Sequence, residues 1–193
     1  MLATAVNAHI DSDDQSSLAN SNIIQYAFQH LYQTSDVEES IREILGLVGR
    51  QINVSRVYIF ENSEDDSESS NTFEWCNEGV EPQIQNLQHI SYDENVPNLL
   101  RSFDEQGIFY SADITQLPMD LYEILERQGI KSILLCAIRD HGVMRGYIGF
   151  DECSINRYWT REQVNMLSFF AEMLSVFLMK KRTEDAYKKL KNG

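Results

Sequence analysis

The stretch IKSILLCAIRDHGVMRGYIGFD, residues 130–151, decides how the rest of the chain is arranged. It reads as two apolar strands, Ser132 to Arg139 and Val143 to Asp151, joined at His141-Gly142. Glycine supplies the positive φ that a two-residue hairpin turn requires. The stretch therefore predicts a β-hairpin at the centre of a sheet.

The two faces of this hairpin differ in polarity. If Asp140 faces Val143 across the turn, alternation of side chains places only apolar residues on one face. That face carries Ile133, Leu135, Ala137, Met144, Gly146, Ile148 and Phe150. The other face is mixed and carries Ser132, Leu134, Cys136, Ile138, Arg145, Tyr147, Gly149 and Asp151. We expect helices behind the apolar face and a cavity or a partly wet surface in front of the mixed one.

Charge and cysteine content narrow the class of protein. The formal net charge is -14, from 16 lysines and arginines against 30 acidic residues, so nucleic acid and anionic membranes are not expected partners. Cys76, Cys136 and Cys153 form no C-x-x-C pair, which disfavours disulfides and structural zinc. No window approaches the ~20 apolar residues of a membrane span. These features predict a soluble, cytoplasmic protein without a metal site.

Two helices are predicted ahead of the first strand. Residues 1–17 are polar and read as a disordered lead-in or linker. Apolar residues recur at helical spacing over residues 18–32. A capping box of Ser35 and Glu38 then opens a second helix, residues 36–51, whose apolar stripe suits the back of the sheet.

The middle of the chain alternates short strands and connecting pieces. Strands are predicted over residues 55–61 and 71–77, with Phe73 and Trp75 on one face. The acidic linker between them lacks the turn glycine and the closing glutamate of a calcium loop, so we read it as a solvated hairpin loop. The segments that would wall a pocket are a helix over 97–105, a strand over 108–111 and a helix over 118–128.

After the hairpin, a capping box of Thr160 and Gln163 opens the longest predicted helix, residues 161–190. Beyond Met179 the sequence turns basic and polar, which indicates an exit helix leading to another domain. We therefore expect one domain over residues 18–181, with 182–193 as the start of a helix or linker to an output domain absent from this chain. The chain would then be a piece of a longer protein.

The order of these elements resembles that of a GAF domain, the small-molecule sensory module of bacterial signalling proteins. The local matches are EWCNEGVEP at 74–82, FYSADITQLP at 109–118, and the hairpin with the following TREQVNMLSFFAEMLSVFL at 160–178. They look most like GAF domains upstream of diguanylate cyclase or histidine kinase domains. The resemblance implies an α+β fold: a six-stranded antiparallel sheet with the terminal helices on one face and a pocket on the other.

In GAF domains that bind bilin, the positions matching Ser132 and Asp151 face the chromophore. The resemblance, together with the mixed face, gives the pocket candidates Ser132, Leu134, Cys136, Tyr147 and Asp151. Trp75 is added because its ring can stack on a planar ligand, although it can equally fill the core. In bilin-binding GAF domains, the cysteine that attaches the chromophore is typically followed by histidine. None of the three cysteines here is, so covalent bilin attachment is not expected. The cofactor is left unknown.

We expect a non-enzymatic sensory domain that binds a small molecule and relays the result through its terminal helices, which would also form a homodimer seam. One alternative is a dimerisation module without a ligand, whose pocket its own side chains fill. A lesser alternative is a thiol reductase acting on free methionine sulfoxide, since some GAF proteins have this activity. Cys136 would then be a reactive thiol rather than a small buried hydrophobe.

Overall fold

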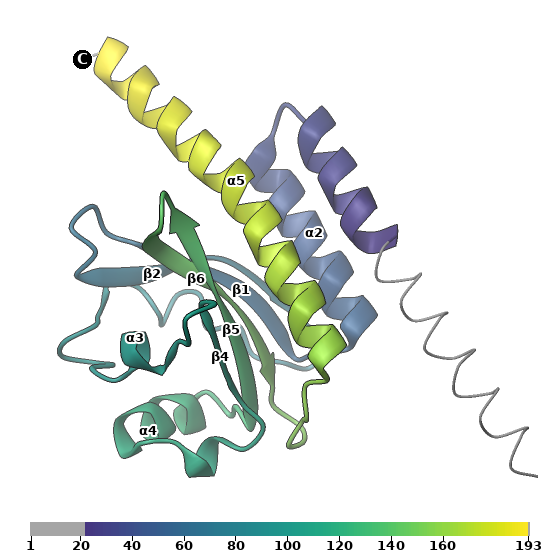
Figure 1. The fold of residues 1–193 in the computed structure, drawn as a ribbon, viewed down its shortest axis with the longest axis vertical. Helices are drawn as coiled ribbons and strands as arrows, with labels where there is room; N and C mark the ends of the chain where they lie inside the picture. Colours follow the sequence, from purple (N-terminus) through teal and green to yellow (C-terminus); the bar gives the residue numbers. More distant parts are fainter. Residues whose placement is uncertain (1–21, 193) are drawn as a thin grey trace, which may run out of the picture.

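The computed structural model describes residues 22–192, which form one antiparallel sheet with helices on both faces (Figure 1). The strand order is β3-β2-β1-β6-β5-β4. The strands are β1 (Arg56–Asn62), β2 (Glu68–Cys76), β3 (Ile90–Ser91), β4 (Ile108–Ser111), β5 (Ser132–Asp140) and β6 (Val143–Glu152). The helices are α2 (Val37–Ile52), α3 (Leu99–Ser102), α4 (Met119–Arg127) and α5 (Arg161–Asn192), with a 3-10 turn, η1 (Ile114–Gln116), and a helix over 22–33. The predicted α+β architecture is confirmed.

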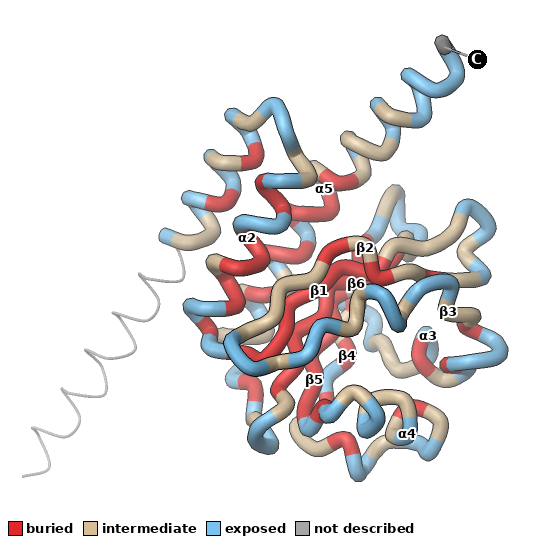
Figure 2. The backbone as a smooth tube through the Cα atoms, turned by 180° about the vertical axis from the view of Figure 1, so that it is seen from behind, coloured by how far each residue is buried: buried red, intermediate tan, exposed pale blue. Residues whose placement is uncertain are grey.

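The sheet separates two apolar cores, visible as buried segments on either side of its strands (Figure 2). We call the side covered by helix 22–33, α2 and α5 the back, and the side covered by α3, α4 and their connections the front. Along β1, Val57 and Ile59 belong to the back core, whereas Tyr58 and Phe60 belong to the front core. The period of two along a strand produces this division.

The helix caps follow local side-chain chemistry. The Thr160 hydroxyl accepts from the Gln163 backbone N–H at 3.2 Å, and the Thr160 N–H donates to the Gln163 side chain at 3.1 Å. This is the predicted capping box at the start of α5. At α2 the cap is Asp36, whose carboxylate accepts from the Glu39 N–H at 3.1 Å, so the assignment of the cap to Ser35 was wrong by one residue.

The central hairpin has the predicted turn but a different register beyond it. Asp140 pairs with Val143, and His141 and Gly142 both have positive φ, as a two-residue turn requires. Two steps later Ile138 pairs with Gly146, which leaves one extra residue in β6, a β-bulge. A slip of one residue exchanges the two faces of a strand.

The bulge reverses the predicted orientation of β5. In the structure Leu134, Cys136 and Ile138 lie in the back core, whereas Ile133 and Leu135 lie in the front core. In β6, Ile148 and Phe150 face the helices and Tyr147 faces the front, as predicted. The assignment of the mixed face is therefore correct for β6 beyond the bulge and wrong for β5.

Two predictions for the N-terminus lie outside the described residues. They are the lead-in at 1–17 and the first part of the helix over 18–32. Among residues 22–192, none of the helices combines the length and apolar character that crossing a membrane requires.

Candidate functional site

A small cavity lies in the front core, between the sheet and the elements that cover it. Its volume is about 60 Å³. Strands β1, β5 and β6 form the floor, and α3, α4 and the segment before β3 form the walls. The side chains lining it are mostly apolar and include Phe60, Leu87, Leu99, Ile124, Leu135 and Tyr147. Tyr58 and Tyr147 contribute the hydroxyl groups at the floor.

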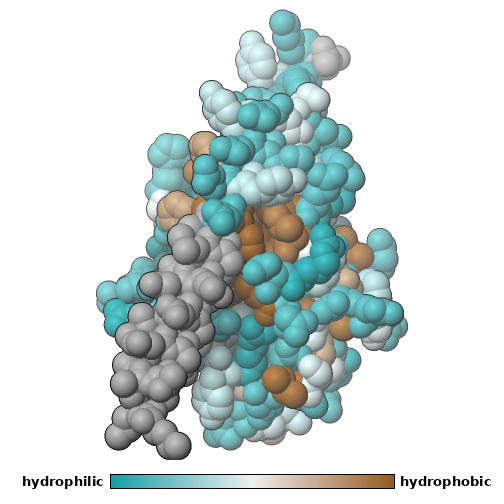
Figure 3. Space-filling model, turned by 90° about the vertical axis from the view of Figure 1, so that its right-hand side faces the viewer, coloured by the Kyte–Doolittle hydropathy of each residue, from teal (hydrophilic) through white to brown (hydrophobic). Residues whose placement is uncertain are grey.

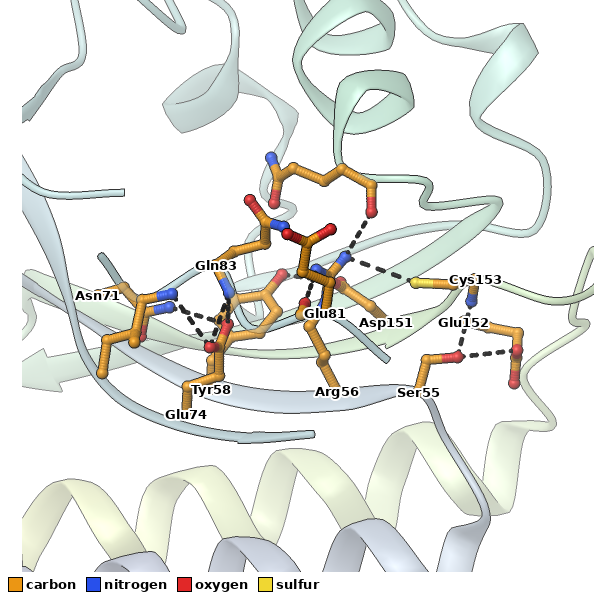
Figure 4. A network of polar contacts seen from close by, with 12 residues as sticks. Ser55, Arg56, Tyr58, Asn71, Glu74, Glu81, Gln83, Asp151, Glu152 and Cys153 are labelled. Atoms are coloured by element: carbon orange, nitrogen blue, oxygen red, sulfur yellow. Dashed lines mark hydrogen bonds and ion pairs between the residues drawn. The ribbon is translucent and has the colours of Figure 1, made fainter. Parts of the chain in front are cut away.

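A buried ion pair lies beside this floor. The Arg56 Nε and the Asp151 Oδ2 are 3.3 Å apart, and both side chains are almost fully buried. The Tyr58 hydroxyl donates to the other carboxylate oxygen of Asp151 at 2.8 Å. Figure 4 shows this group on the face of the sheet opposite the helices, formed by neighbouring residues of β1 and β6. Two strands that pair directly therefore bring together residues 95 positions apart in the chain.

The Arg56 guanidinium also holds the walls of the front core. It donates to the Glu81 carbonyl oxygen at 3.2 Å and to the Gln128 carbonyl oxygen at 2.9 Å. Gln128 caps α4 at its C-terminus and lines the cavity, while Glu81 belongs to the loop that follows β2. One buried cation thus ties the sheet to both covering segments, because an arginine presents several donors in a fixed plane.

The pair is close but not fully hydrogen-bonded. Within the described residues, Arg56 Nε and Asp151 Oδ2 have no aligned hydrogen-bond partner. Burial raises the pKa of Asp151 to about 6, although Arg56 and the hydrogen bond from Tyr58 act to lower it. Burial likewise raises the pKa of the Tyr58 phenol, with the Asp151 charge adding to the effect. The front of the sheet therefore holds a buried carboxylate whose charge is costly and only partly compensated.

Two of the three thiols, those of Cys136 and Cys76, are poorly suited to nucleophilic chemistry. Burial raises the pKa of Cys136 to about 12, and its sulfur lies 3.7 Å from the Ser168 hydroxyl on α5, at the back of the sheet. Burial and the Glu74 carboxylate raise the pKa of Cys76 to about 12. Since the thiolate is the nucleophile, thiols with these pKa values are almost wholly unreactive at neutral pH.

Only two of the six predicted pocket residues face the front. Tyr147 lines the cavity, and Asp151 lies in the buried ion pair beside it. Leu134 and Cys136 belong to the back core because of the bulge in β6. Ser132 is buried on the β5 face shared with Leu134, where its hydroxyl accepts from the Arg157 N–H at 3.1 Å.

Trp75 also lies at the back. Its ring packs on the glycines of α2, where a Cβ at Gly49 would lie only 2.2 Å from a ring carbon. The Arg50 guanidinium stacks over the same ring at 5.9 Å from its centroid. Of the two roles considered for Trp75, filling the core is the one its position fits, because two glycines on one helix face make room for an indole.

Arg56 and Tyr58 were not identified from the sequence as site residues. The signal was present, since Val57 and Ile59 alternate with them and were assigned to the strand 55–61. Once those two face the helices, alternation places Arg56 and Tyr58 at the front. The strand pattern does not identify the ion-pair partner of Arg56, because nothing in the sequence around Arg56 points to Asp151.

No cluster of three or more histidine, cysteine or acidic side chains with metal-binding geometry occurs within residues 22–192. In the acidic hairpin loop, Asp65 instead accepts hydrogen bonds from Ser63 and from the Ser67 N–H and hydroxyl. Asp66 pairs with Arg145 at 2.7 Å. These contacts fit the predicted solvated hairpin loop.

The model of the GAF domain family matches residues 36–178. The chain belongs to the GAF family. Its sequence is 32% identical over 152 residues to a methanogenesis regulatory histidine kinase, FilI, of Methanothrix harundinacea. That alignment covers 77% of this chain but only 17% of the kinase. The GAF fold predicted from the hairpin and its flanks is thereby confirmed.

Solved structures of GAF domains share the fold at low sequence identity. The phycoerythrobilin-bound GAF domain of a cyanobacterial phytochrome superimposes with a TM-score of 0.74 at 15% identity, covering 88% of this chain and 99% of that one. The chromophore-binding domain of the Stigmatella aurantiaca bacteriophytochrome gives 0.67 at 16% identity, covering 84% of this chain and 60% of that one. Identities this low support the fold alone.

Proposed function

We propose that this GAF domain is a sensory module, not an enzyme, that binds a small molecule in the front core and relays binding through α5. The observation that carries the proposal is the apolar cavity beside the partly compensated pair of Arg56 and Asp151. An apolar pocket with a few convergent polar groups and a perturbed pKa is the usual form of a ligand site. The FilI relative supports a histidine kinase output, and a diguanylate cyclase is the other candidate.

The cavity restricts the ligand. At about 60 Å³ it is far smaller than the ~300 to 1,000 Å³ of pockets that enclose drug-sized molecules. A tetrapyrrole does not fit this volume, and no cysteine is followed by histidine for covalent attachment. The lining favours a compact, mainly apolar molecule with one hydrogen-bonding group toward Tyr58 and Tyr147. Larger ligands require α4 to move away from the sheet.

The small volume of the cavity also fits the second candidate function, a dimerisation module whose front core is filled by its own side chains. The two functions differ in what the purified chain carries. Ile124 on α4 lines the cavity and is only partly buried, so a phenylalanine there fills the cavity from its wall. Met119 on the same helix is exposed and outside the cavity, which makes Met119→Phe a matched control.

We expect mass spectrometry of small molecules released from the denatured chain to find a compound with the wild type and with Met119→Phe. Ile124→Phe is expected to reduce its amount at least about tenfold, since overpacking a filled cavity is unfavourable. Equal amounts from both variants would contradict a site in the front core. No retained compound, and no binding from a metabolite collection, would favour the ligand-free module.

A reductase function has less support. The raised pKa values of Cys136 and Cys76 oppose thiolate formation, and Cys136 lies beneath α5 rather than at the cavity. The three cysteines are free, which fits the reducing cytoplasm proposed for the domain.

We also propose that the domain forms a homodimer through helix 22–33 and α5. Large hydrophobic side chains on these helices are exposed, among them Phe28, Tyr32, Phe169 and Val176. Phe28 also contacts Phe177 across the two helices, with ring centroids 5.8 Å apart, so the exposed residues flank one seam. In Figure 3, the side carrying helix 22–33 and α2 is largely hydrophilic, with hydrophobic side chains gathered near its centre. Such patches are typical of interaction sites.

A further inference from the structure

The C-terminal part of α5 leaves the domain with little apolar anchoring. Up to Leu178 the helix is held by buried side chains, the last of them Leu178 itself. None of the described side chains from residue 180 to residue 191 is buried, and the helix extends past the sheet (Figure 1). The direction of this exit segment must therefore depend on polar contacts near its root.

Arg182 makes the strongest of these contacts. Its guanidinium donates to both carboxylate oxygens of Glu61, at 2.7 Å each, and to a carboxylate oxygen of Glu38 at 2.8 Å. Glu61 is the penultimate residue of β1 and Glu38 lies in the first turn of α2, so the Arg182 side chain joins three elements. The bonds to Glu61 raise the pKa of Arg182. Forked arginine–carboxylate bonds are both strong and geometrically specific.

The ring of Phe73 in β2 supports the junction that Arg182 forms with Glu61 and Glu38. Arg42 of α2 lies 5.3 Å from the ring centroid and Arg182 lies 5.9 Å from it. Both cations are thus placed over an aromatic side chain that is itself 2% exposed. Cation–π contacts of this kind add to the positioning of Arg182 relative to the sheet.

The junction adjoins the front cavity through the backbone of β1. Glu61 follows Phe60, whose ring lines the cavity and stacks on Tyr147 at 4.9 Å. The pairing of β1 with β2 shifts register at Ile59 and Phe60, and Gly146 of β6, which lies next to the bulge, is opposite Glu61. A shift of the Phe60 ring therefore acts on a locally irregular strand end, and Glu61 is the next residue along it.

We infer that Arg182 is the positioning residue that couples the front cavity to the direction of the exit helix. Residues on β1 that respond to a ligand displace Glu61, and the forked pair transmits the displacement to α5. This inference rests on the proposed sensory function. The contact itself, however, can be tested without any ligand.

Hydrogen exchange of the 193-residue chain tests whether Arg182 holds the exit helix. Lys180→Gln is the control for Arg182→Gln. Lys180 is an exposed cation two residues away, and within residues 22–192 its one ion pair is with Glu184, one turn along the same helix, at 3.9 Å. We expect amides of residues 183–191 to exchange about five- to tenfold faster in Arg182→Gln, since a charge-assisted contact holding the segment is lost. Lys180→Gln should change them less than about twofold. Arg182→Lys should fall between, because lysine cannot make the fork.

A second exchange experiment tests whether a change at the front cavity reaches the exit helix through Arg182. Ile124→Phe fills the cavity, so we expect it to alter exchange over residues 183–191 when Arg182 is present and to leave it unchanged in the Arg182→Gln background. Additive effects of the two substitutions, or equal exchange in Arg182→Gln and Lys180→Gln, would overturn the inference. Failure to recover a ligand by mass spectrometry would contradict the proposed function alone, because neither hydrogen-exchange experiment depends on a ligand.

Discussion

Replacing Arg56 by methionine is expected to lower the free energy of unfolding by about 3 to 5 kcal/mol, because removal of one partner leaves a buried charge uncompensated. Asp151 would have to remain charged in an apolar core or take up a proton. The carbonyl groups of Glu81 and Gln128 would also lose their donor. Urea denaturation at neutral pH measures this change, as a lower midpoint at an unchanged slope.

Two variants separate the loss of the pair from the loss of a cation. Arg127 is exposed and pairs with Glu123 at 3.5 Å on the surface of α4, so Arg127→Met should cost less than about 0.5 kcal/mol. The double variant Arg56→Met, Asp151→Leu should recover part of the stability, because an apolar pair can replace a buried ion pair. An Arg56→Met variant as stable as Arg127→Met would show that the pair is not buried as described.

Replacing Val176 by glutamate is expected to raise the dimer dissociation constant about ten- to a hundredfold. Val176 is 67% exposed in the single chain and lies on the same side of α5 as Phe169, seven residues earlier. Residues spaced by seven share one face of a helix, and a carboxylate buried at their contact with a second copy would lack a partner. Sedimentation equilibrium over a range of protein concentrations measures the constant.

The matched control for this prediction is Ile155→Glu. Ile155 is 61% exposed and lies in the connection between β6 and α5, outside the helical seam. It therefore adds the same charge without touching the proposed contact. A wild-type chain that is monomeric at high concentration, or equal weakening by both substitutions, would contradict a dimer through helix 22–33 and α5.

Local sequence signals predicted most of the fold. The hairpin turn at His141 and Gly142 and the capping box of Thr160 and Gln163 each depend on a few adjacent residues, and the structure has both. The back core could also be predicted in part, because the stripes of α2 and α5 repeat at helical spacing and Ile148 and Phe150 alternate in β6. Backbone geometry fixes these patterns, so they can be read without tertiary information.

The candidate site was predicted less well because one residue altered the register. Gly146 has φ +148°, and a Cβ there would lie 2.0 Å from the Phe60 carbonyl oxygen. A glycine inside a strand is a known signal of a bulge, and the bulge beside Gly146 is what places Leu134 and Cys136 at the back of the sheet. The pairing of Arg56 with Asp151 could not be predicted in the same way, since it depends on which strands are neighbours in the sheet.

The central claim is that the apolar core at the front of the sheet, and not the apolar core at its back, can accept a guest. Xenon enters apolar cavities, so methyl spectra of the chain under xenon pressure test the claim directly. Leu134 and Leu135 are adjacent and equally buried, but they face the back and the front respectively. The claim predicts shifts of the Leu135 and Ile124 methyl signals with little change at Leu134. Shifts at Leu134 and Ile148 with none at Leu135 would contradict it.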